Sequence, residues 1–126
     1  MLNLSGKLTT KRYGNKNRRK VEKYILDFKE KIGKDLDVDL LRKVTKACGP
    51  SIFTRDAETV SGSSASELET VKKNFLVKKL GLKDDEKLDV ALNSVLEKYG
   101  RSNRNKYRPI VYYLLAKHFK KEDQFN

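Results

Sequence analysis

The segment that decides the fold is Tyr107–Phe119, which reads Y-R-P-I-V-Y-Y-L-L-A-K-H-F. It is the longest apolar run in a chain in which 37% of the residues are charged. Apolar and aromatic side chains would fall on nearly every face of a helix over these residues, and a helix that is hydrophobic all round is normally buried. The pattern therefore predicts a central helix around which the other segments pack. The run is too short to cross a bilayer, which needs about 20 apolar residues.

Four further helices are predicted where apolar residues recur every three or four positions between helix start and stop signals. They cover approximately residues 17–32, 38–48, 66–80 and 84–99, and each is followed by a glycine that favours helix termination. No segment alternates between apolar and polar residues as a half-buried strand does. The fold class is therefore predicted to be all-α: a compact bundle of about five helices packed around the hydrophobic C-terminal helix.

The starts of these helices are predicted from capping chemistry. Asp37 and Asp84 are the expected N-caps of the second and fourth helices, because a carboxylate accepts hydrogen bonds from the first free amides. The third helix is expected to begin at Ser66, with Glu69 completing a capping box. The expected cap of the last helix is one of Ser102, Asn103 and Asn105.

Residues 49–65 form the longest weakly patterned connection, G-P-S-I-F-T-R-D-A-E-T-V-S-G-S-S-A. Ile52, Phe53 and Val60 are expected to fold against the core as a short helical turn, with S-G-S-S (61–64) as the exposed tip. A serine-rich loop between helices could hold a phosphate or be modified, but it lacks the Gly-x-x-x-x-Gly-Lys pattern that cradles nucleotides. We interpret the segment as a linker.

Composition limits the chain to one domain. With 126 residues, of which 37% are hydrophobic, it can bury a single core. The predicted organisation is a flexible basic arm over residues 1–20, a helical domain over 21–121 and a C-terminal tail over 122–126. The single Cys48 excludes an intramolecular disulfide, and no signal-peptide core is present. We therefore expect a soluble cytoplasmic protein with no membrane partner.

The net charge of +12 is concentrated at the two ends of the chain. Residues 1–20 carry seven Lys or Arg and no acid, which gives +7. Residues 21–100 carry fifteen bases and fifteen acids, and residues 101–126 carry seven bases and two acids, which gives +5. Because phosphate contacts benefit from a high local density of positive charge, this distribution favours a polyanionic partner.

The first 20 residues allow three interpretations. They contain two glycines and no sustained apolar period, so they are expected to form a flexible basic arm. An organellar transit peptide is a second possibility, since the segment is free of acids, but Gly6 and Gly14 weaken the amphipathic helix that such peptides need. A plain solvated tail is the third.

Three separate blocks are similar to a known family. They are L-L-R-K-V-T-K-A-C-G-P-S-I (40–52), E-L-E-T-V-K-K-N-F-L-V-K-K-L-G-L (67–82) and E-K-Y-G-R-S-N-R-N-K-Y-R-P-I-V-Y-Y-L-L-A-K-H-F (97–119). The first block covers most of the predicted second helix and the residues that follow it. Over roughly residues 21–121 the chain resembles a family of small bacterial proteins known only as a domain of unknown function. The resemblance implies a compact all-helical protein and carries over no activity, cofactor or catalytic residue. Members of the family begin close to the first helix, so residues 1–20 look like an extension.

The residues themselves show no signature of an enzyme, and we predict no catalytic residue, cofactor or metal ligand. Cys48 would lie at the C-terminal end of a helix, where the helix dipole disfavours a thiolate. His118 is the only histidine, and a surface position at the end of a basic helix explains it. One His and one Cys without a spaced cluster do not make a metal site. Candidate carboxylate pairs fall in the first turns of helices, where capping explains them.

The strongest candidate binding site is a set of basic and polar residues in the arm and near the last helix. Four bases fall within residues 101–108 with no acid, before a helix whose free amides attract anions. Asn side chains could reach sugars or base edges, and Tyr107 could stack on a base or join the core. A competing explanation is that these bases neutralise acids elsewhere in the fold. The predicted set is Lys11, Arg12, Arg18, Arg19, Lys20, Arg101, Asn103, Arg104, Lys106, Tyr107, Arg108, Lys117, Lys120 and Lys121.

Two hypotheses of function remain open. In the first, the protein is not an enzyme and binds nucleic acid with weak sequence preference, the candidates being DNA and RNA, the latter free or on the ribosome. Arm and C-terminal patch would then share one surface, and deleting residues 1–20 would flatten the salt dependence of binding. In the second, it is a protein-interaction module that docks an acidic protein or associates with itself through exposed aromatics such as Tyr112 or Phe125. The sequence leaves monomer and dimer equally open.

Overall fold

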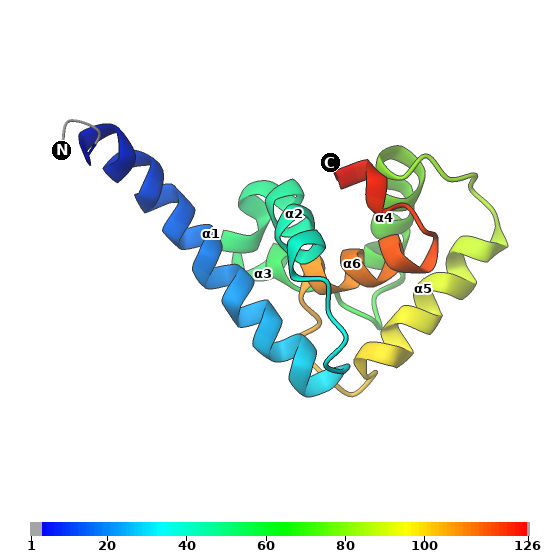
Figure 1. Cartoon of the computed structure of the whole chain (residues 1–126). Coiled ribbons are helices and arrows are strands. Elements are labelled where there is room, and N and C mark those ends of the chain that lie inside the picture. The colour runs from blue at the N-terminus through cyan, green and yellow to red at the C-terminus, as the bar shows by residue number, and fades with distance from the viewer. Residues whose placement is uncertain (1–3, 126) are drawn as a thin grey trace.

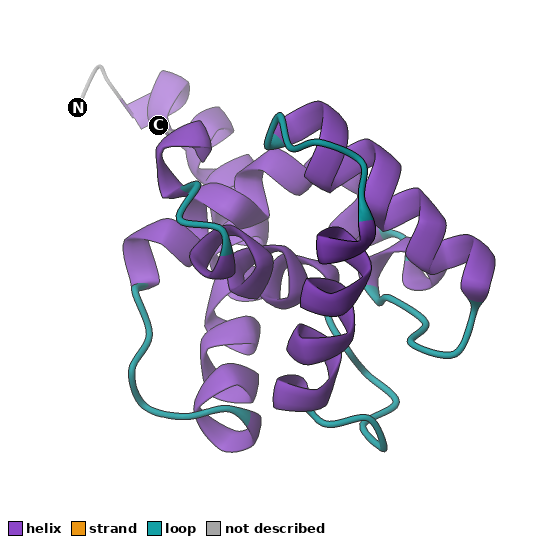
Figure 2. Ribbon diagram, turned by 90° about the vertical axis from the view of Figure 1, so that its right-hand side faces the viewer, coloured by secondary structure: helices purple, strands orange, loops and turns teal. Residues whose placement is uncertain are grey.

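The computed structural model describes residues 4–125, with side chains from residue 17 onward, and the described chain is helical without a β-strand. Figure 2 shows these helices and the loops that join them. The six α-helices are α1 (Leu4–Lys31), α2 (Val38–Cys48), α3 (Arg55–Glu58), α4 (Ala65–Val71), α5 (Glu86–Tyr99) and α6 (Arg108–His118). Two 3-10 helices, η1 (Gly49–Phe53) and η3 (Glu122–Phe125), and one π-helix, η2 (Lys72–Lys79), complete the described elements. The all-α class is confirmed.

Helix α6 is the centre of the fold, as the sequence predicts. Seven of its eleven residues are buried, and it packs against α1, α2, α3 and α5. In Figure 1 it runs through the middle of the molecule with these helices around it. Burying its aliphatic residues removes from water the largest continuous apolar surface of the chain, which is the main favourable contribution to folding. Among the described residues no helix is both long enough and apolar enough to cross a membrane.

Helix α1 begins at Leu4, thirteen residues before the expected start at Asn17. Figure 1 shows its N-terminal half projecting beyond the other helices. The two glycines in residues 1–20 favour the predicted flexible arm, because each costs a helix about 1 kcal/mol. A helix that is already formed by packing at Val21, Tyr24 and Phe28 lengthens without a second nucleation cost, and no proline interrupts residues 4–31. The expected irregular arm is therefore a helical extension of α1 over the described residues.

The predicted aspartate cap is correct for α2, whereas the cap of α5 lies one residue later than predicted. The side chain of Asp37 accepts a hydrogen bond from the Leu40 amide at 3.1 Å, as predicted. Helix α5 is capped by Asp85, which accepts from the Lys87 amide at 2.9 Å, and not by Asp84. The carboxylate of Asp84 instead pairs with Lys72 on η2.

The cap of α4 is Ser64, which corrects the prediction of Ser66. Ser64 Oγ accepts a hydrogen bond from the Glu67 amide at 3.3 Å, and the helix begins at Ala65. The sequence holds two overlapping capping boxes, Ser64-x-x-Glu67 and Ser66-x-x-Glu69, and local rules do not choose between them. The earlier one is used because the Glu67 carboxylate is held by Arg108 of the central helix.

The start of α6 also differs from the prediction. Its N-cap is Tyr107, and no side chain caps it, so the prediction of Ser102, Asn103 or Asn105 is wrong. Tyr107 is in extended conformation because it forms an antiparallel bridge with Thr59, which sets where the helix can begin. Pro109 follows within the first turn, where a missing amide costs no helical hydrogen bond.

The connection after α2 and the C-terminal residues are more ordered than expected. Ile52 and Val60 are buried, as predicted, but Phe53 is 43% exposed. Phe125, expected in an exposed tail, is buried in η3, where its ring lies 6.0 Å from that of Phe75. Tyr112 is partly buried and stacks on Phe75 at 3.9 Å. Neither aromatic therefore offers the exposed contact surface that self-association was expected to use.

Candidate anion-binding site

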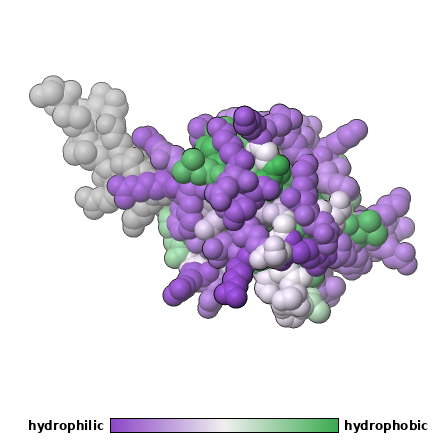
Figure 3. All heavy atoms as spheres, turned by 90° about the horizontal axis from the view of Figure 1, so that it is seen from below, coloured by the Kyte–Doolittle hydropathy of each residue, from purple (hydrophilic) through white to green (hydrophobic). Residues whose placement is uncertain are grey.

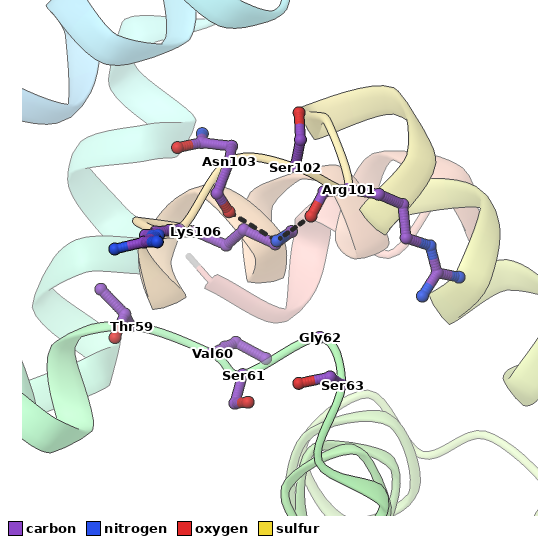
Figure 4. Close-up of a pocket in the computed structure, with 10 residues that line it drawn as sticks. Thr59, Val60, Ser61, Gly62, Ser63, Arg101, Ser102, Asn103 and Lys106 are labelled. Carbon is purple, nitrogen blue, oxygen red and sulfur yellow. Dashed lines mark hydrogen bonds between the residues drawn. The ribbon is translucent and has the colours of Figure 1, made fainter.

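A pocket of about 400 Å³ lies between the loop after α3 and the connection from α5 to α6. Figure 4 shows the two backbone segments facing each other across it. The residues that line it are Thr59, Val60, Ser61, Gly62, Ser63, Arg101, Ser102, Asn103, Arg104 and Lys106. They include three cationic side chains and three serines and no carboxylate. The arrangement suits a negatively charged ligand.

Lys106 holds the connection in shape. Its side chain is 5% exposed, and its Nζ donates hydrogen bonds to the Arg101 carbonyl at 2.9 Å and to the Asn103 carbonyl at 2.5 Å. Figure 4 draws both bonds. Burial lowers the pKa of Lys106, and the nearby positive charge of Arg101 lowers it further. The acceptors of the ammonium are neutral carbonyls, and it has no carboxylate partner among the described residues.

The opposite wall is held against the connection by the backbone. The Val60 amide donates a 2.8 Å hydrogen bond to the Lys106 carbonyl. Gly62 then passes directly over the Lys106 side chain, so that a Cβ added to Gly62 would lie 3.5 Å from Cε and 3.6 Å from Nζ. Because both walls are attached to Lys106, the pocket is formed without a ligand.

Arg101 and Asn103 have internal partners. The Arg101 guanidinium bonds Glu97 at 2.8 Å and Asn93 at 2.7 Å, both on α5. The Asn103 side chain points away from the serine loop in Figure 4, and its Oδ1 accepts from Lys31 at the end of α1 at 3.4 Å. Its Nδ2 is buried without a hydrogen-bond partner in the described structure. These two residues position the connection, and each retains N–H groups without a hydrogen-bond partner in the described structure.

Three predicted residues serve the interior of the protein, which corrects their assignment to phosphate contact. Lys20 pairs with Glu58 at 2.9 Å, and the Tyr107 ring packs 5.2 Å from that of Tyr24. Arg108 is mostly buried, and its guanidinium bonds the Ala57 carbonyl at 2.6 Å and the Glu67 carboxylate at 2.5 Å. Burial would lower the pKa of Arg108, but Tyr112 and Glu67 outweigh it and raise that pKa.

Other predicted cations remain exposed. Arg18, Arg19 and Arg104 have no ion pair within the described residues. Lys117 pairs with Glu122 at 3.9 Å, whereas Lys120 and Lys121 lie beyond the end of α6 without an ion pair in the described part of the chain. The side chains of Lys11 and Arg12 lie outside the described residues.

The predicted residues do not form one patch. In Figure 1 the α5–α6 connection lies at the bottom of the molecule beside the end of α1, while the C-terminal residues lie near the top. Lys120 and Lys121 are therefore separated from the pocket by the length of α6, about 16 Å. Figure 3, which shows the molecule from below, has hydrophilic side chains over most of the visible face. Lys120 and Lys121 therefore do not share a surface with the α5–α6 connection, contrary to the expectation that both chain ends converge on one surface.

The described residues also include side chains of the types that ligate metals or act as nucleophiles. Among the described residues no group of three or more His, Cys, Asp and Glu could hold a metal ion. Burial raises the pKa of the Cys48 thiol to about 12, so this thiol is not a nucleophile at neutral pH. His118 is exposed at the end of α6.

Sequence reasoning missed the serine loop as part of the site. The sequence predicts S-G-S-S (61–64) as the exposed tip of a linker, although a serine-rich loop is also compatible with phosphate binding. It also missed Glu58, which lies in the same connection and receives two lysines and a tyrosine. An acid among weakly patterned residues gave no signal, because its partners are 34 to 38 residues away.

Comparison with known proteins agrees with the resemblance predicted from the sequence. A family model described as "Protein of unknown function (DUF2853)" matches residues 23–123. The matched region contains the pocket and begins after the basic residues 1–20. No curated protein matches the chain.

Proposed function

The chain belongs to DUF2853, a family of proteins of unknown function, and from that premise we propose that it is a non-enzymatic protein that binds the phosphate backbone of nucleic acids. The observation that carries the proposal is the contrast between two classes of cation. Lys20 and Arg108 are paired with carboxylates inside the fold. Arg18, Arg19 and Arg104 are exposed and lack a carboxylate partner among the described residues.

The proposed contact path follows α1 to the α5–α6 connection. Arg19 and Lys23 are one helical turn apart and so share a face of α1. The ammonium of Lys23 lies 4.5 Å from the centre of the Tyr107 ring, which follows Arg104 by three residues. The face that carries Arg19 therefore continues toward the connection.

The length of this path suits a nucleic acid. Arg18 precedes Lys31 by thirteen residues, which is about 20 Å along a helix. Lys31 in turn reaches Asn103 of the connection. A distance of about 20 Å covers roughly six phosphates of one strand of a B-form duplex. The site of action that we propose is the cytoplasm, where a single reduced cysteine is usual.

The test is the salt dependence of binding. Each phosphate contact adds about 0.9 to the slope of log K against log salt for a duplex, and about 0.7 for a single strand. The double variant Arg18→Gln, Arg19→Gln should therefore reduce the slope by roughly 1.4 to 1.8. The matched control is Lys83→Gln, Lys87→Gln, which removes the same charge from exposed positions in the loop before α5 and in its first turn.

We expect the control to retain most of the slope. Absence of binding by the full chain at low salt would refute the proposal. An equal reduction by both double variants would show that net charge alone attracts the polyanion. Recovery of a nuclease-resistant complex with an acidic protein from native lysate would favour the interaction-module hypothesis instead.

A further inference from the structure

The pocket between residues 59–63 and 101–106 contains a buried cation that has no role in the proposed contact with the phosphate backbone of a nucleic acid. Lys106 is a buried cation whose two hydrogen-bond acceptors are neutral carbonyls. A buried charge is normally paired with an opposite charge, because desolvation is costly. The ammonium has a third N–H, and an anion that accepts from it would supply the missing charge.

Gly62 lies directly beside this ammonium. A methyl group at this position would lie in van der Waals contact with Lys106 Cε and Nζ, at 3.5 and 3.6 Å, and would fill the space next to the ammonium on the side of the loop. Ser61 and Ser63 flank Gly62, and both are exposed. Arg104, also exposed, lines the opposite wall. Residues with hydroxyl, guanidinium and ammonium groups thus line the same pocket.

The size of the pocket indicates the kind of anion. Its volume of about 400 Å³ is within the range of small-ligand sites, about 300–1,000 Å³, and exceeds what one phosphate needs. A phosphodiester inside a strand carries one charge and continues in both directions, so its two sugars would meet both walls. A terminal phosphate has three free oxygens and a charge of roughly −1.5 to −2 at neutral pH. It is attached to only one sugar, so the strand continues from it in only one direction.

We propose that this pocket binds the terminal phosphate monoester of a nucleic acid strand, with Lys106 beneath Gly62 as the central donor and Arg104 at the rim. The identity of the ligand rests on the proposed function, and the pocket adds selectivity for strand ends to backbone binding. Burial, and after it the positive charge of Arg101, lowers the pKa of Lys106, and a bound phosphate would favour the charged form of its ammonium.

The test compares three forms of one short single-stranded oligonucleotide, with a 5′-phosphate, with a 3′-phosphate and with neither. Binding to the full chain is measured by fluorescence anisotropy at one fixed salt concentration. We expect at least one phosphorylated end to bind about tenfold more tightly than the unphosphorylated strand, as charge-assisted hydrogen bonds to a dianion would give.

Gly62→Ala is the decisive variant, because it places a methyl group over the ammonium and retains every cation. Its contacts at 3.5 to 3.8 Å are ordinary, so the fold is expected to persist with an unchanged melting temperature. The variant should lose the preference for a phosphorylated end and retain binding of the unphosphorylated strand. Arg104→Gln should weaken the preference, whereas the matched exposed control Lys87→Gln should leave it intact.

Equal binding of all three oligonucleotides by the wild-type chain would overturn the inference and leave backbone binding standing. A preference that survives in Gly62→Ala would also overturn it, since the extra charge would then be recognised elsewhere. Absence of binding to every oligonucleotide at low salt is a separate result, in which the proposed function and this inference fail together.

Discussion

The hydroxyl of Tyr24 donates a 2.7 Å hydrogen bond to the carboxylate of Glu58, joining α1 to α3 across 34 residues of sequence. Tyr24 is fully buried, and Glu58 is one of the few buried charged residues among those described. Lys20 and Lys23 donate to the same Glu58 oxygen at 2.9 and 3.2 Å. Because the serine loop (residues 61–63) begins three residues later, this contact also fixes one wall of the pocket.

Glu58→Gln should lower the free energy of unfolding by about 2–3 kcal/mol, because three donors lose their charged acceptor inside the fold. Urea denaturation followed by circular dichroism measures the change. Glu69→Gln is the matched control, since Glu69 is half exposed and its contacts with Lys72 and Lys73 are 3.8 Å or longer. The control should cost less than about 1 kcal/mol. Equal losses in the two variants would contradict the structural role of Glu58.

The stability of the protein should depend on pH through Glu58. Burial alone would raise the pKa of this carboxyl, but hydrogen bonds from Tyr24, Lys20 and Lys23 outweigh it and lower the pKa. The folded state then binds fewer protons than the unfolded state, so this contribution is complete above the unfolded pKa of about 4.3. It is lost as the pH falls through the lower pKa of the folded state.

Urea denaturation between roughly pH 6 and pH 3 should therefore show a steeper loss of stability in the wild-type protein than in Glu58→Gln. Glu69→Gln should follow the wild-type curve, since no buried carboxylate is removed. Parallel curves for the wild type and Glu58→Gln would exclude Glu58 as the source of the acid dependence.

Arg108→Lys should lower the free energy of unfolding by about 2–3 kcal/mol, although it conserves the charge. The guanidinium bonds Ala57, Tyr112 and Glu67 at the same time, and an ammonium cannot match this planar geometry. Thermal unfolding measures the effect. The exposed Arg104→Lys should stay within about 0.5 kcal/mol of the wild type. A stable Arg108→Lys protein would show that the three bonds contribute little.

Ser64→Ala should cost about 1 kcal/mol, because Ser64 Oγ accepts the hydrogen bond that caps α4. Ser66→Ala should be nearly neutral, since Ser66 lies inside the first turn of the helix, where alanine is favoured. Chemical denaturation of the two variants distinguishes the overlapping capping boxes. A larger loss in Ser66→Ala would restore the cap predicted from the sequence.

The helices that were predicted correctly depend on local patterns. The burial of Ile110, Val111 and Leu115 follows from a run that leaves no polar face for solvent. Asp37 is identified as a cap because its partner amide is three residues away. Where two local solutions compete, as at Ser64 and Ser66, the choice depends on Arg108, which is 41 residues from Glu67. Sequence spacing carries no information about that contact.

The sequence by itself determined the all-helical class, the central C-terminal helix and the excess of positive charge at both ends, because composition and periodicity are properties of neighbouring residues. Only the tertiary structure decided which cations are available to a ligand. It paired Arg108 with Glu67, left Arg18, Arg19 and Arg104 exposed, and placed Lys106 in the wall of a pocket without a carboxylate partner among the described residues. The partner of a charged side chain is set by the packing of helices distant in sequence, so identical residue types within residues 101–108 have different roles.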